Sequence, residues 1–587
     1  MKPFRRKTMT VKIGSIGVGS MEPIRIQSMT TTPTHQVDQT VDQIMQLCDA
    51  GCEIVRVTVQ GKKEAQACHK IKSQLIQKGY TAPIVADIHF YPPAALEVVE
   101  YVDKVRINPG NFLDKRAQFK QVLFESDEAY LKELERIEEG FAPLVIRAKE
   151  LGKALRIGVN HGSLSDRIMS RYGDNPTGMV ESAIEYAQIC VKYNFHNFLF
   201  SMKSSNPLVM IEAYRLLVKK MDELGWYYPL HLGVTEAGMG EDGRIKSALG
   251  IGTLLLDGIG DTIRVSLTED PWHEIKPASS IISHVNQYKK QQRRDDITIL
   301  KPDVKRPFSS FFHPQGSVCL KISKEDLISE TFLNDLGIVF DGKSYIKSDK
   351  SPDIIFYDSK EVDLSSLQQQ LSAIVMVDFA AAPRRFLNYK NLSQPIPSEV
   401  DFALLNIKSN TRDEIKLMAQ RLIEKGIPFI FDASYQTYDE ALIGASIDIG
   451  SLLIEGIGSG ALLRANCSIK ERLELIFSLL QACRMRTSKP DYIACPGCGR
   501  TLFNLQQVTT EIQERTKHLK GVKIAIMGCI VNGPGEMADA DFGYVGSKTG
   551  QIDLYVGKTA VEKNIPSSLA TEKLIELIKK EQMWVDP

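Results

Sequence analysis

The sequence predicts an α/β protein of three parts. These are an N-terminal (β/α)8 TIM barrel over residues 1–270, an inserted, degenerate barrel-like domain over 271–488, and a small α/β domain over 489–587. Two observations support this prediction. Short apolar strands alternate with helix-like stretches, which is typical of parallel α/β folds. In addition, a segment near the end of the first part recurs near the end of the second. A chain of 587 residues is long enough for three or four such domains.

Composition and charge exclude several classes of protein. Lys plus Arg and Asp plus Glu both total 72, so the net charge favours neither nucleic acid nor an anionic membrane as a partner. We find no apolar run near the roughly twenty residues that span a bilayer. The basic residues 1–10 lack the apolar segment of a secretory signal. Ten cysteines in so large a chain do not indicate a disulfide scaffold, so we expect a cytoplasmic protein.

The first part contains eight predicted strands, each next to a helix-like stretch. In a (β/α)8 barrel the active site lies at the C-terminal ends of the strands. The predicted strands are 24–30, 53–59, 83–90, 104–110, 154–160, 197–203, 228–236 and 261–268.

Five of these strands carry a cation near their C-terminal ends. Four contain an aliphatic-Arg-aliphatic tripeptide, and a fifth ends in lysine. Side chains alternate along a strand, so the flanking aliphatic residues face the helices and the cation faces the barrel axis. The five cations are Arg56, Arg106, Arg156, Lys203 and Arg264.

Five buried charges need an anionic partner, because an unpaired buried charge costs several kcal/mol. Asp87 and Glu236 are the acids that we identify in the barrel, and two carboxylates do not balance five cations. We therefore predict a small diphosphate or cyclic diphosphate as the ligand. The alternative, that carboxylates of the barrel neutralise all five cations, stays open.

Polar residues follow the same strands. Asp87 and His89 share a strand face and form a titratable pair at the rim, and Glu236 is a further candidate for proton transfer. We interpret His161 and His231 as structural. The polar companions of the cations are Asn108, Asn160 and Ser266.

The middle part contains a degenerate copy of the barrel. Residues 251–260 recur as 449–458, but the position that matches Arg264 holds Leu462. A duplication that kept the packing and lost the site would leave this pattern, so we expect a structural role. The polar stretch 283–306 is predicted to be a helix or linker. The predicted strands are 317–322, 353–357, 373–379, 402–407, 428–431 and 451–456.

The last part carries a Cys-x-x-Cys pair, Cys495 and Cys498, followed by Cys529 and Glu536. Three thiolates are one short of the four that hold an ordinary iron–sulfur cluster or structural zinc, so Glu536 is the candidate fourth ligand. From spacing alone, an iron–sulfur cluster, a zinc site and a redox dithiol all stay open. In the turn 532–535 we expect the glycines to let backbone N–H groups approach cluster sulfurs. The elements predicted around these ligands are strands 522–527, 542–545 and 552–556 and a helix over 571–582.

Long motifs resemble one known family. CPGCGR and MGCIVNGPGE, together with VRVT, VRINPGN, RIGVNHGSL, FSMKSSN, HLGVTEAG and KSALGIGTLLLDGIGDTIRVSLT, resemble the 4-hydroxy-3-methylbut-2-en-1-yl diphosphate synthase family. The resemblance covers the first 270 residues and the last hundred. The middle part resembles the extra domain of the long form of that family.

The resemblance implies an oxidoreductase of non-mevalonate isoprenoid biosynthesis. The family opens 2-C-methyl-D-erythritol 2,4-cyclodiphosphate and reductively dehydroxylates it to 4-hydroxy-3-methylbut-2-enyl diphosphate. It uses one 4Fe-4S cluster, held by residues that match Cys495, Cys498, Cys529 and Glu536, and electrons from reduced ferredoxin or flavodoxin. The five cations, with Asn108, Asn160 and Ser266, match its substrate site. A homodimer is a further expectation, since the two-domain form pairs domains of different subunits. The alternatives are a non-redox phosphosugar lyase with a structural zinc site and an electron-transfer module.

Overall fold

The computed structural model describes residues 5–114, 121–122, 126–290, 312–379, 386–408, 410–531, 533–537 and 539–587. The chain forms two compact units. Pro3–Ser283 and Lys489–Pro587 make the first unit together, and His284–Ser488 makes the second. The division of the first unit into two domains, at the boundaries given above, stays a prediction.

The first unit contains the predicted barrel. Its eight strands pair in parallel and in chain order, and a bridge between Phe200 and Leu230 joins the two ends of the sheet. The eight predicted strands are all present, so the barrel prediction is confirmed. The strands are β3 (Arg25–Met29), β4 (Ile54–Val59), β5 (Ile84–Ile88), β6 (Lys104–Ile107), β7 (Ala154–Asn160), β8 (Phe198–Lys203), β9 (His231–Leu232) and β10 (Thr262–Ile263).

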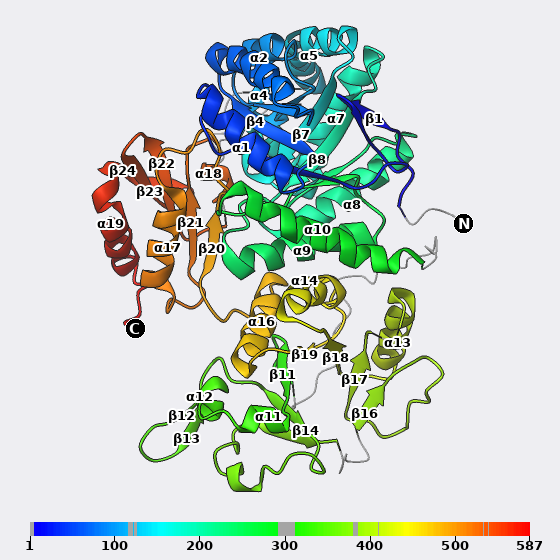
Figure 1. Ribbon diagram of the computed structural model, residues 1–587, viewed down its shortest axis with the longest axis vertical. Helices are drawn as coiled ribbons and strands as arrows, with labels where there is room; N and C mark the ends of the chain where they lie inside the picture. The colour runs from blue at the N-terminus through cyan, green and yellow to red at the C-terminus, as the bar shows by residue number, and fades with distance from the viewer. Residues whose placement is uncertain are drawn as a thin grey trace. The chain divides into compact units, whose positions relative to one another are not determined.

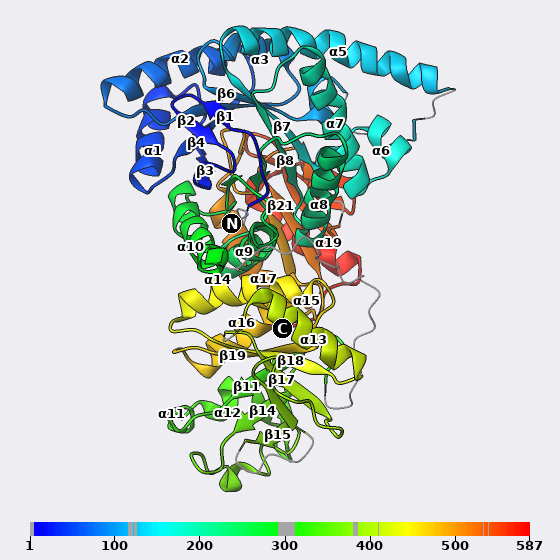
Figure 2. The ribbon, with the colours of Figure 1, turned by 90° about the vertical axis from the view of Figure 1, so that its right-hand side faces the viewer.

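Helices wrap around these strands, as Figures 1 and 2 show. Several begin at an Asn-Pro pair, because asparagine accepts a hydrogen bond from the first turn and proline suits the first helical position. Asn108, Asn175 and Asn206 are such caps. The helices are α1 (Val37–Asp49), α2 (Lys62–Gln77), α3 (Pro92–Val98), α4 (Pro109–Phe112), α5 (Asp127–Glu150), α6 (Asp166–Tyr172), α7 (Pro176–Lys192), α8 (Pro207–Glu223), α9 (Gly240–Leu256) and α10 (Ile275–Asn286), with 3-10 turns η1 (His161–Ser163) and η2 (Pro271–Glu274).

An N-terminal hairpin closes one end of the barrel. Strands β1 (Val11–Ile13) and β2 (Ile16–Val18) pair antiparallel. Their side chains pack with Ile54, Val85 and Leu199 at the beginnings of the barrel strands. This end is therefore filled with apolar side chains, and the polar residues are left to the C-terminal ends of the strands.

The second unit contains a seven-stranded sheet in which every pairing is parallel. This sheet is the barrel-like structure that was predicted. A small hairpin, β12 (Ile338–Phe340) with β13 (Tyr345–Lys347), lies outside the sheet. Of the polar stretch 283–306, residues 291–306 lie outside the described residues. The strands, in spatial order, are β15 (Val375–Asp378), β14 (Ile354–Tyr357), β11 (Ser317–Lys321), β19 (Gly460–Arg464), β18 (Phe429–Ser434), β17 (Phe402–Asn406) and β16 (Phe386–Tyr389).

The strand predicted at 451–456 is wrong. Helix α14 (Tyr438–Asp448) is followed by α15 (Gly450–Leu453), and the strand begins only at Gly460. The repeated segment is thus the end of a helix and the turn that follows it, as at the end of α9 in the barrel. Leu462, at the position that matches Arg264, is fully buried in an apolar core with Phe356 and Phe402.

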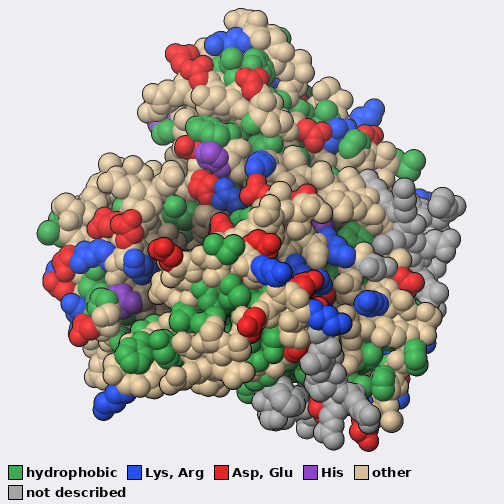
Figure 3. Space-filling view, turned by 60° about the horizontal axis from the view of Figure 1, so that its bottom comes forward, with side chains coloured by type: hydrophobic (Ala, Val, Ile, Leu, Met, Phe, Trp, Pro, Cys, Tyr) green, Lys and Arg blue, Asp and Glu red, His purple; other side chains and the backbone are tan. Residues whose placement is uncertain are grey.

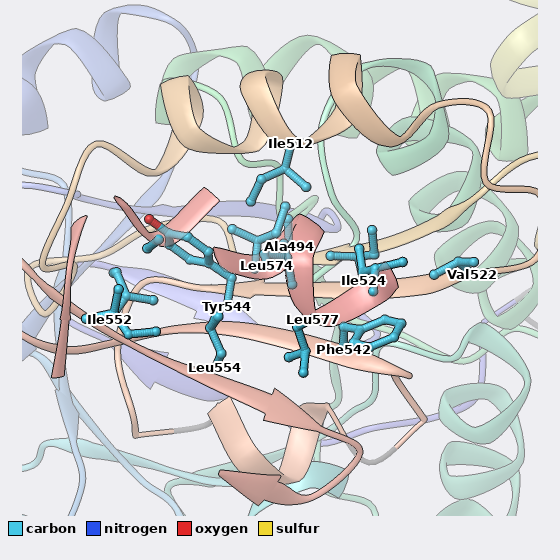
Figure 4. Packing of buried hydrophobic residues seen from close by; sticks show 14 of the residues in the cluster. Ala494, Ile512, Val522, Ile524, Phe542, Tyr544, Ile552, Leu554, Leu574 and Leu577 are labelled. Carbon is cyan, nitrogen blue, oxygen red and sulfur yellow. The ribbon is translucent and has the colours of Figure 1, made fainter. Parts of the chain in front are cut away.

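The C-terminal segment of the first unit forms a five-stranded sheet. Its strands are β20 (Asp491–Ala494), β21 (Lys523–Met527), β22 (Phe542–Lys548), β23 (Gln551–Val556) and β24 (Thr559–Pro566). Helices α17 (Leu505–Thr516) and α19 (Ser567–Lys580) pack on it. Figure 4 shows Ile512 from α17 and Leu574 and Leu577 from α19 against the apolar side chains of the strands.

Two further observations concern the surface. In the described part of the chain, no helix is long and apolar enough to cross a membrane. Figure 3 shows one face of the molecule, on which basic and acidic side chains are interspersed.

Candidate active site

A pocket opens where the C-terminal ends of the barrel strands meet the loops of the C-terminal segment. Its volume is about 640 Å³, including the open solvent at its mouth. Both parts of the first unit line it. The lining residues are Met29, Arg56, Asp87, His89, Arg106, Asn160, Lys203, Thr235, Glu236, Arg264, Ser266, Cys495, Pro496, Gly497, Cys498, Arg500, Met527, Cys529, Val531 and Gly533.

Strand β20 brings the first cysteines to this mouth. Ala494 forms a parallel bridge with Ala237, at the end of the barrel segment that contains β9. The Thr268 hydroxyl donates to the carbonyl oxygens of Ala494 and Cys495 at 3.3 and 3.0 Å. Lys246 Nζ lies 2.7 Å from Asp491 Oδ1. The Cys-x-x-Cys loop therefore begins at a position that the barrel fixes.

Two glycines let the loop after Cys529 touch the barrel. Helix α18 (Gly533–Glu536) lies against η1, and Figure 1 shows it at the edge of the barrel. A Cβ atom on Gly535 would lie 1.4 Å from the carbonyl oxygen of Gly162, and one on Gly162 would lie 2.1 Å from the Glu536 nitrogen. Only glycine permits this contact. The approach of backbone N–H groups in the turn 532–535 to cluster sulfurs stays a prediction, and Asn532 lies outside the described residues.

Asp87 is the centre of the polar network. Its Oδ1 accepts from Arg106 Nη1 at 2.9 Å, and its Oδ2 accepts from Arg500 Nη2 at 2.9 Å. Arg106 Nη2 also donates to Asn160 Oδ1 at 3.0 Å. Burial raises the pKa of the Asp87 carboxyl, but the charges of Arg106 and Arg56 lower it more, so the net pKa is well below its usual value. Asp87 is therefore a permanent anion.

His89 is neutral in this network. Burial lowers its pKa to about 3, and the charges of Arg500 and Arg106 act in the same direction. Its Nε2 lies 2.6 Å from Arg106 Nη1, which can only donate, so Nε2 accepts and Nδ1 carries the proton. Asn111 Nδ2 lies 3.0 Å from His89 Nδ1, and Asn111 Oδ1 has no partner among the described residues. If the Asn111 amide is flipped, so that Oδ1 and Nδ2 exchange places, Oδ1 accepts the hydrogen bond from Nδ1–H.

Three cations at the strand ends have no carboxylate of their own among the described residues: Arg56, Arg156 and Lys203. Burial lowers the pKa of Arg56 to about 9, and Arg264, Arg106 and Arg500 add to the effect, opposed by Asp87. Burial also lowers the pKa of Arg156 and of Lys203 well below their usual values. Within the described structure, Nε and Nη1 of Arg156 are buried without a hydrogen-bond partner. These groups would be stabilised by an anion.

Arg264 differs from these three cations because it has a carboxylate partner. Its Nε and Nη2 both lie 2.9 Å from the Glu274 carboxylate on η2, and both side chains are about 2% exposed or less. Burial lowers its pKa, but Glu274 raises it more. Glu274 is an acid that the sequence analysis did not include. Arg264 is thus neutralised, although it still lines the pocket.

The three cysteines lie on the side of the pocket opposite the barrel strands. The Gly528 N–H donates to Cys495 Sγ at 3.2 Å. Burial raises the pKa of Cys495, as does the charge of Cys529. Burial and Cys498 raise the pKa of Cys529 to about 11, while Arg500 opposes them. The described residues hold no set of three Cys, His, Asp or Glu side chains grouped for one metal ion.

Two buried carboxyl groups, Glu236 and Glu536, interact electrostatically with each other. Burial raises the pKa of Glu536 well above its usual value, Glu236 adds to this, and hydrogen bonds from Gly162 and Asn160 oppose it. Glu536 Oε1 and Glu236 Oε2 are buried and have no hydrogen-bond partner in the described structure. Burial also raises the pKa of Glu236, against Thr235 and Lys203. Glu236 has a φ of 48°, a strained conformation often found at functional sites.

Comparison with known proteins identifies the family. A model described as "GcpE TIM-barrel domain" matches residues 8–279, and one described as "GcpE protein C-terminal domain" matches residues 491–580. A protein of Protochlamydia amoebophila (strain UWE25), named 4-hydroxy-3-methylbut-2-en-1-yl diphosphate synthase (flavodoxin), is 49% identical over 99% of this chain and 97% of its own. This chain belongs to the 4-hydroxy-3-methylbut-2-en-1-yl diphosphate synthase (GcpE) family. The Arabidopsis thaliana protein, named the chloroplastic ferredoxin form, is 46% identical over 100% of this chain and 88% of its own.

For this GcpE family member, the pocket gathers most of the residues predicted from the sequence. Three lie outside the lining: Asn108, Arg156 and Glu536. Asn108 caps α4 and donates to Ser163 Oγ at 2.7 Å, so its visible contacts are structural. Arg156 is fully buried. Ser266 lines the pocket, with an Oγ that lacks a partner among the described atoms.

Sequence reasoning missed Lys104, Glu274 and Arg500. Lys104 is fully buried and faces inward, two residues before Arg106, so strand alternation could have identified it. Glu274 lies on a 3-10 turn beyond the last strand, and no pattern in the sequence pairs it with Arg264. Arg500 stands in the quoted CPGCGR motif, but only the fold brings it to Asp87.

Proposed function

We propose that the pocket binds the cyclic diphosphate between the barrel cations and a 4Fe-4S cluster held by the C-terminal loops. The family's reaction is the reductive ring opening and dehydroxylation of 2-C-methyl-D-erythritol 2,4-cyclodiphosphate to 4-hydroxy-3-methylbut-2-enyl diphosphate in non-mevalonate isoprenoid biosynthesis. As a member, the chain is an oxidoreductase of this pathway. One observation supports our assignment of the site above all: Arg56 and Lys203, buried cations without carboxylates of their own among the described residues, line the same pocket as three cysteines.

The barrel supplies the charge that binds the substrate. Arg56 and Lys203 line the pocket, and their pKa values are lowered mainly by burial, so a diphosphate would relieve the cost of their charged forms. Each charge-assisted contact contributes about 1.5–3 kcal/mol. Arg106 is held at four points by Asp87, His89, Gly158 and Asn160, so it presents a fixed rather than an adaptable charge. Such a fixed arrangement orients the ring before reaction.

The chemistry of the C-terminal loops fits an iron–sulfur cofactor. Cys495, Cys498 and Cys529 would supply thiolates, and Glu536, with its unpartnered Oε1, would supply the fourth, exchangeable ligand. The Gly528 N–H and the positive charge of Arg500 both favour thiolates in a buried place. A bound 4Fe-4S cluster would supply single electrons and a Lewis-acidic iron next to the substrate.

A departing hydroxyl leaves more readily as water, so the pocket needs a proton donor. Glu236 suits this role because burial raises its pKa and its Oε2 lacks a partner among the described residues. Asp87 and His89, the other two candidates from the sequence, are less suited. The Asp87 carboxyl is held ionised by arginines, and the His89 imidazole is held neutral by burial. We therefore assign Glu236 as the proton donor, with Asp87 and His89 orienting Arg106.

The electron donor we propose is reduced ferredoxin or flavodoxin, the two proteins that the names of the relatives print. None of the ten cysteines forms a disulfide in the described structure, which suits a reducing cytoplasm. One chain carries both sides of the pocket in one compact unit, so a homodimer is not needed to complete the site.

The test uses full-length protein purified without oxygen. We measure iron and acid-labile sulfide, then turnover of the cyclic diphosphate with a chemical reductant. Lys203→Met should keep the iron and lower kcat/KM by about 10- to 100-fold, since one charge-assisted contact is lost. Cys529→Ser should lose both iron and turnover. The control, Cys467→Ser, alters a half-buried cysteine of the second unit and should change neither. Stoichiometric zinc without sulfide, or full turnover by Lys203→Met, would contradict the proposal.

A further inference from the structure

Arg500 is the one pocket arginine that comes from the C-terminal segment in the described structure. It lies in the loop between β20 and α17, two residues after Cys498. Its side chain is 9% exposed. Nη2 donates to Asp87 Oδ2 at 2.9 Å, while Nε and Nη1 are buried and have no partner among the described residues. A guanidinium has five N–H donors in a rigid fork, so most of its capacity is unused.

The Asp87 carboxylate makes no hydrogen bond to Nε or Nη1 of Arg500 in the described structure. Its other oxygen already accepts from Arg106 Nη1 at 2.9 Å. Asp87 thus bridges Arg106 of the barrel and Arg500 of the C-terminal segment, and each arginine donates to a different carboxylate oxygen. The pocket that Arg500 lines also contains Arg56 and Lys203, which have no carboxylate of their own in the described part of the chain. The uncompensated charge in this pocket therefore comes from both sides of the domain contact.

We propose that Arg500 is a further contact for the anionic substrate, supplied from the cysteine side of the pocket and held ready by Asp87. The class of ligand rests on the proposed function. It is a diphosphate, whose oxygens accept hydrogen bonds from the Arg500 N–H groups that do not bind Asp87. An anion bound by Arg500 and by Arg56 or Lys203 joins the C-terminal segment to the barrel. Anion binding and docking of the two parts then stabilise each other, because thermodynamic coupling between two equilibria is reciprocal.

A purely structural Arg500 would behave differently. If its one role were the ion pair with Asp87, its loss would loosen the contact between barrel and C-terminal segment to the same extent with and without an anion. The affinity for anions would then stay as it was. The proposal instead requires that the anion tightens the contact, and that this tightening depends on Arg500.

The test compares Arg500→Met and Arg500→Lys with the matched control Arg515→Met. Arg515 is 40% exposed on α17 of the same segment and pairs with Glu572. The protein is the full-length, iron-loaded enzyme, and iron content is measured for each variant. The first readout is the Kd for inorganic pyrophosphate and for the cyclic diphosphate, by calorimetry. The second is amide hydrogen exchange across residues 493–502, with and without pyrophosphate.

In the wild type and in Arg515→Met, pyrophosphate should slow exchange in this loop. Arg500→Met should raise both Kd values by about 10- to 100-fold and should lose the slowing. Arg500→Lys keeps the charge without the fork, so it should fall between the two, and it serves as the test variant if Arg500→Met does not fold. An unchanged Kd, or slowing that persists in Arg500→Met, would overturn the proposal. A wild type that binds pyrophosphate but does not turn over the cyclic diphosphate would refute the proposed function alone.

Discussion

The contact between Gly162 and Gly535 predicts a large effect for Gly535→Ala. The added Cβ would lie 1.4 Å from the Gly162 carbonyl oxygen and 2.2 Å from its carbonyl carbon. Ordinary contacts between heavy atoms are about 3.5 Å, so the two backbones would have to separate by about 2 Å. The displaced atoms belong to backbone on both sides, and no side chain can rotate to make room. Glu536, the next residue, would move away from the barrel.

A misplacement of about 1 Å at a reacting centre can cost about 100-fold in rate. We therefore expect Gly535→Ala to lower kcat/KM for the cyclic diphosphate by at least about 100-fold. The C-terminal core does not involve Gly535, so this segment should remain folded. The assay is anaerobic turnover with a chemical reductant, together with iron content and circular dichroism. Gly61→Ala is the control, since its added Cβ would have 3.7 Å to the nearest atom. Wild-type turnover by Gly535→Ala would refute the reasoning.

Three further predictions concern other residues. Glu274→Gln leaves the Arg264 guanidinium buried without a carboxylate and should reduce the free energy of unfolding by about 3–5 kcal/mol, measured with denaturant. The control is Glu269→Gln, at the more exposed pair with Arg244, which should reduce the free energy of unfolding by less. Equal reductions in the two variants would contradict this account. In the second unit, burial raises the pKa of Asp448, but His284, Lys408 and Tyr288 lower it more. The ionised carboxylate therefore stabilises the fold above about pH 4, and this stabilisation is lost as the pH falls through the folded-state pKa. The gap in melting temperature between wild type and Asp448→Asn should therefore be full at pH 7 and shrink below pH 4; a gap that widens in acid would be the wrong sign. Finally, a mixture of Arg56→Met and Cys529→Ser chains should show no more turnover than its parts, because one chain carries both sides of the pocket; restored activity would mean that the site forms between chains.

The sequence was sufficient for much of the site because the relevant patterns are local. Strand alternation turns Arg56, Arg106 and Arg156 inward, and a Cys-x-x-Cys spacing needs only one loop. The partners of these groups were harder to predict, since Arg500 and Asp87 are separated by 413 positions. The pairing of Arg264 with Glu274 could not be predicted for a different reason. Glu274 is near in sequence but on a 3-10 turn, where strand alternation does not apply.

The strand wrongly predicted at 451–456 also shows the limits of local sequence patterns. A short run of leucine and isoleucine fits a buried strand and a buried helix equally well. The tertiary context of an α/β repeat, in which helix and strand follow one another, decides between them. The strand at Gly460–Arg464 was missed because two glycines, Gly458 and Gly460, mark its start and look like a turn.

The most direct test of the central claim, that cations and cysteines form one site, is paramagnetic resonance of the reduced, anaerobically purified protein. The account predicts an iron–sulfur signal whose shape changes when the cyclic diphosphate is added. In Lys203→Met the same change should require about 10- to 100-fold more of the compound. A signal that the cyclic diphosphate leaves unaltered at saturation, or a protein that gives none after reduction, would contradict the claim.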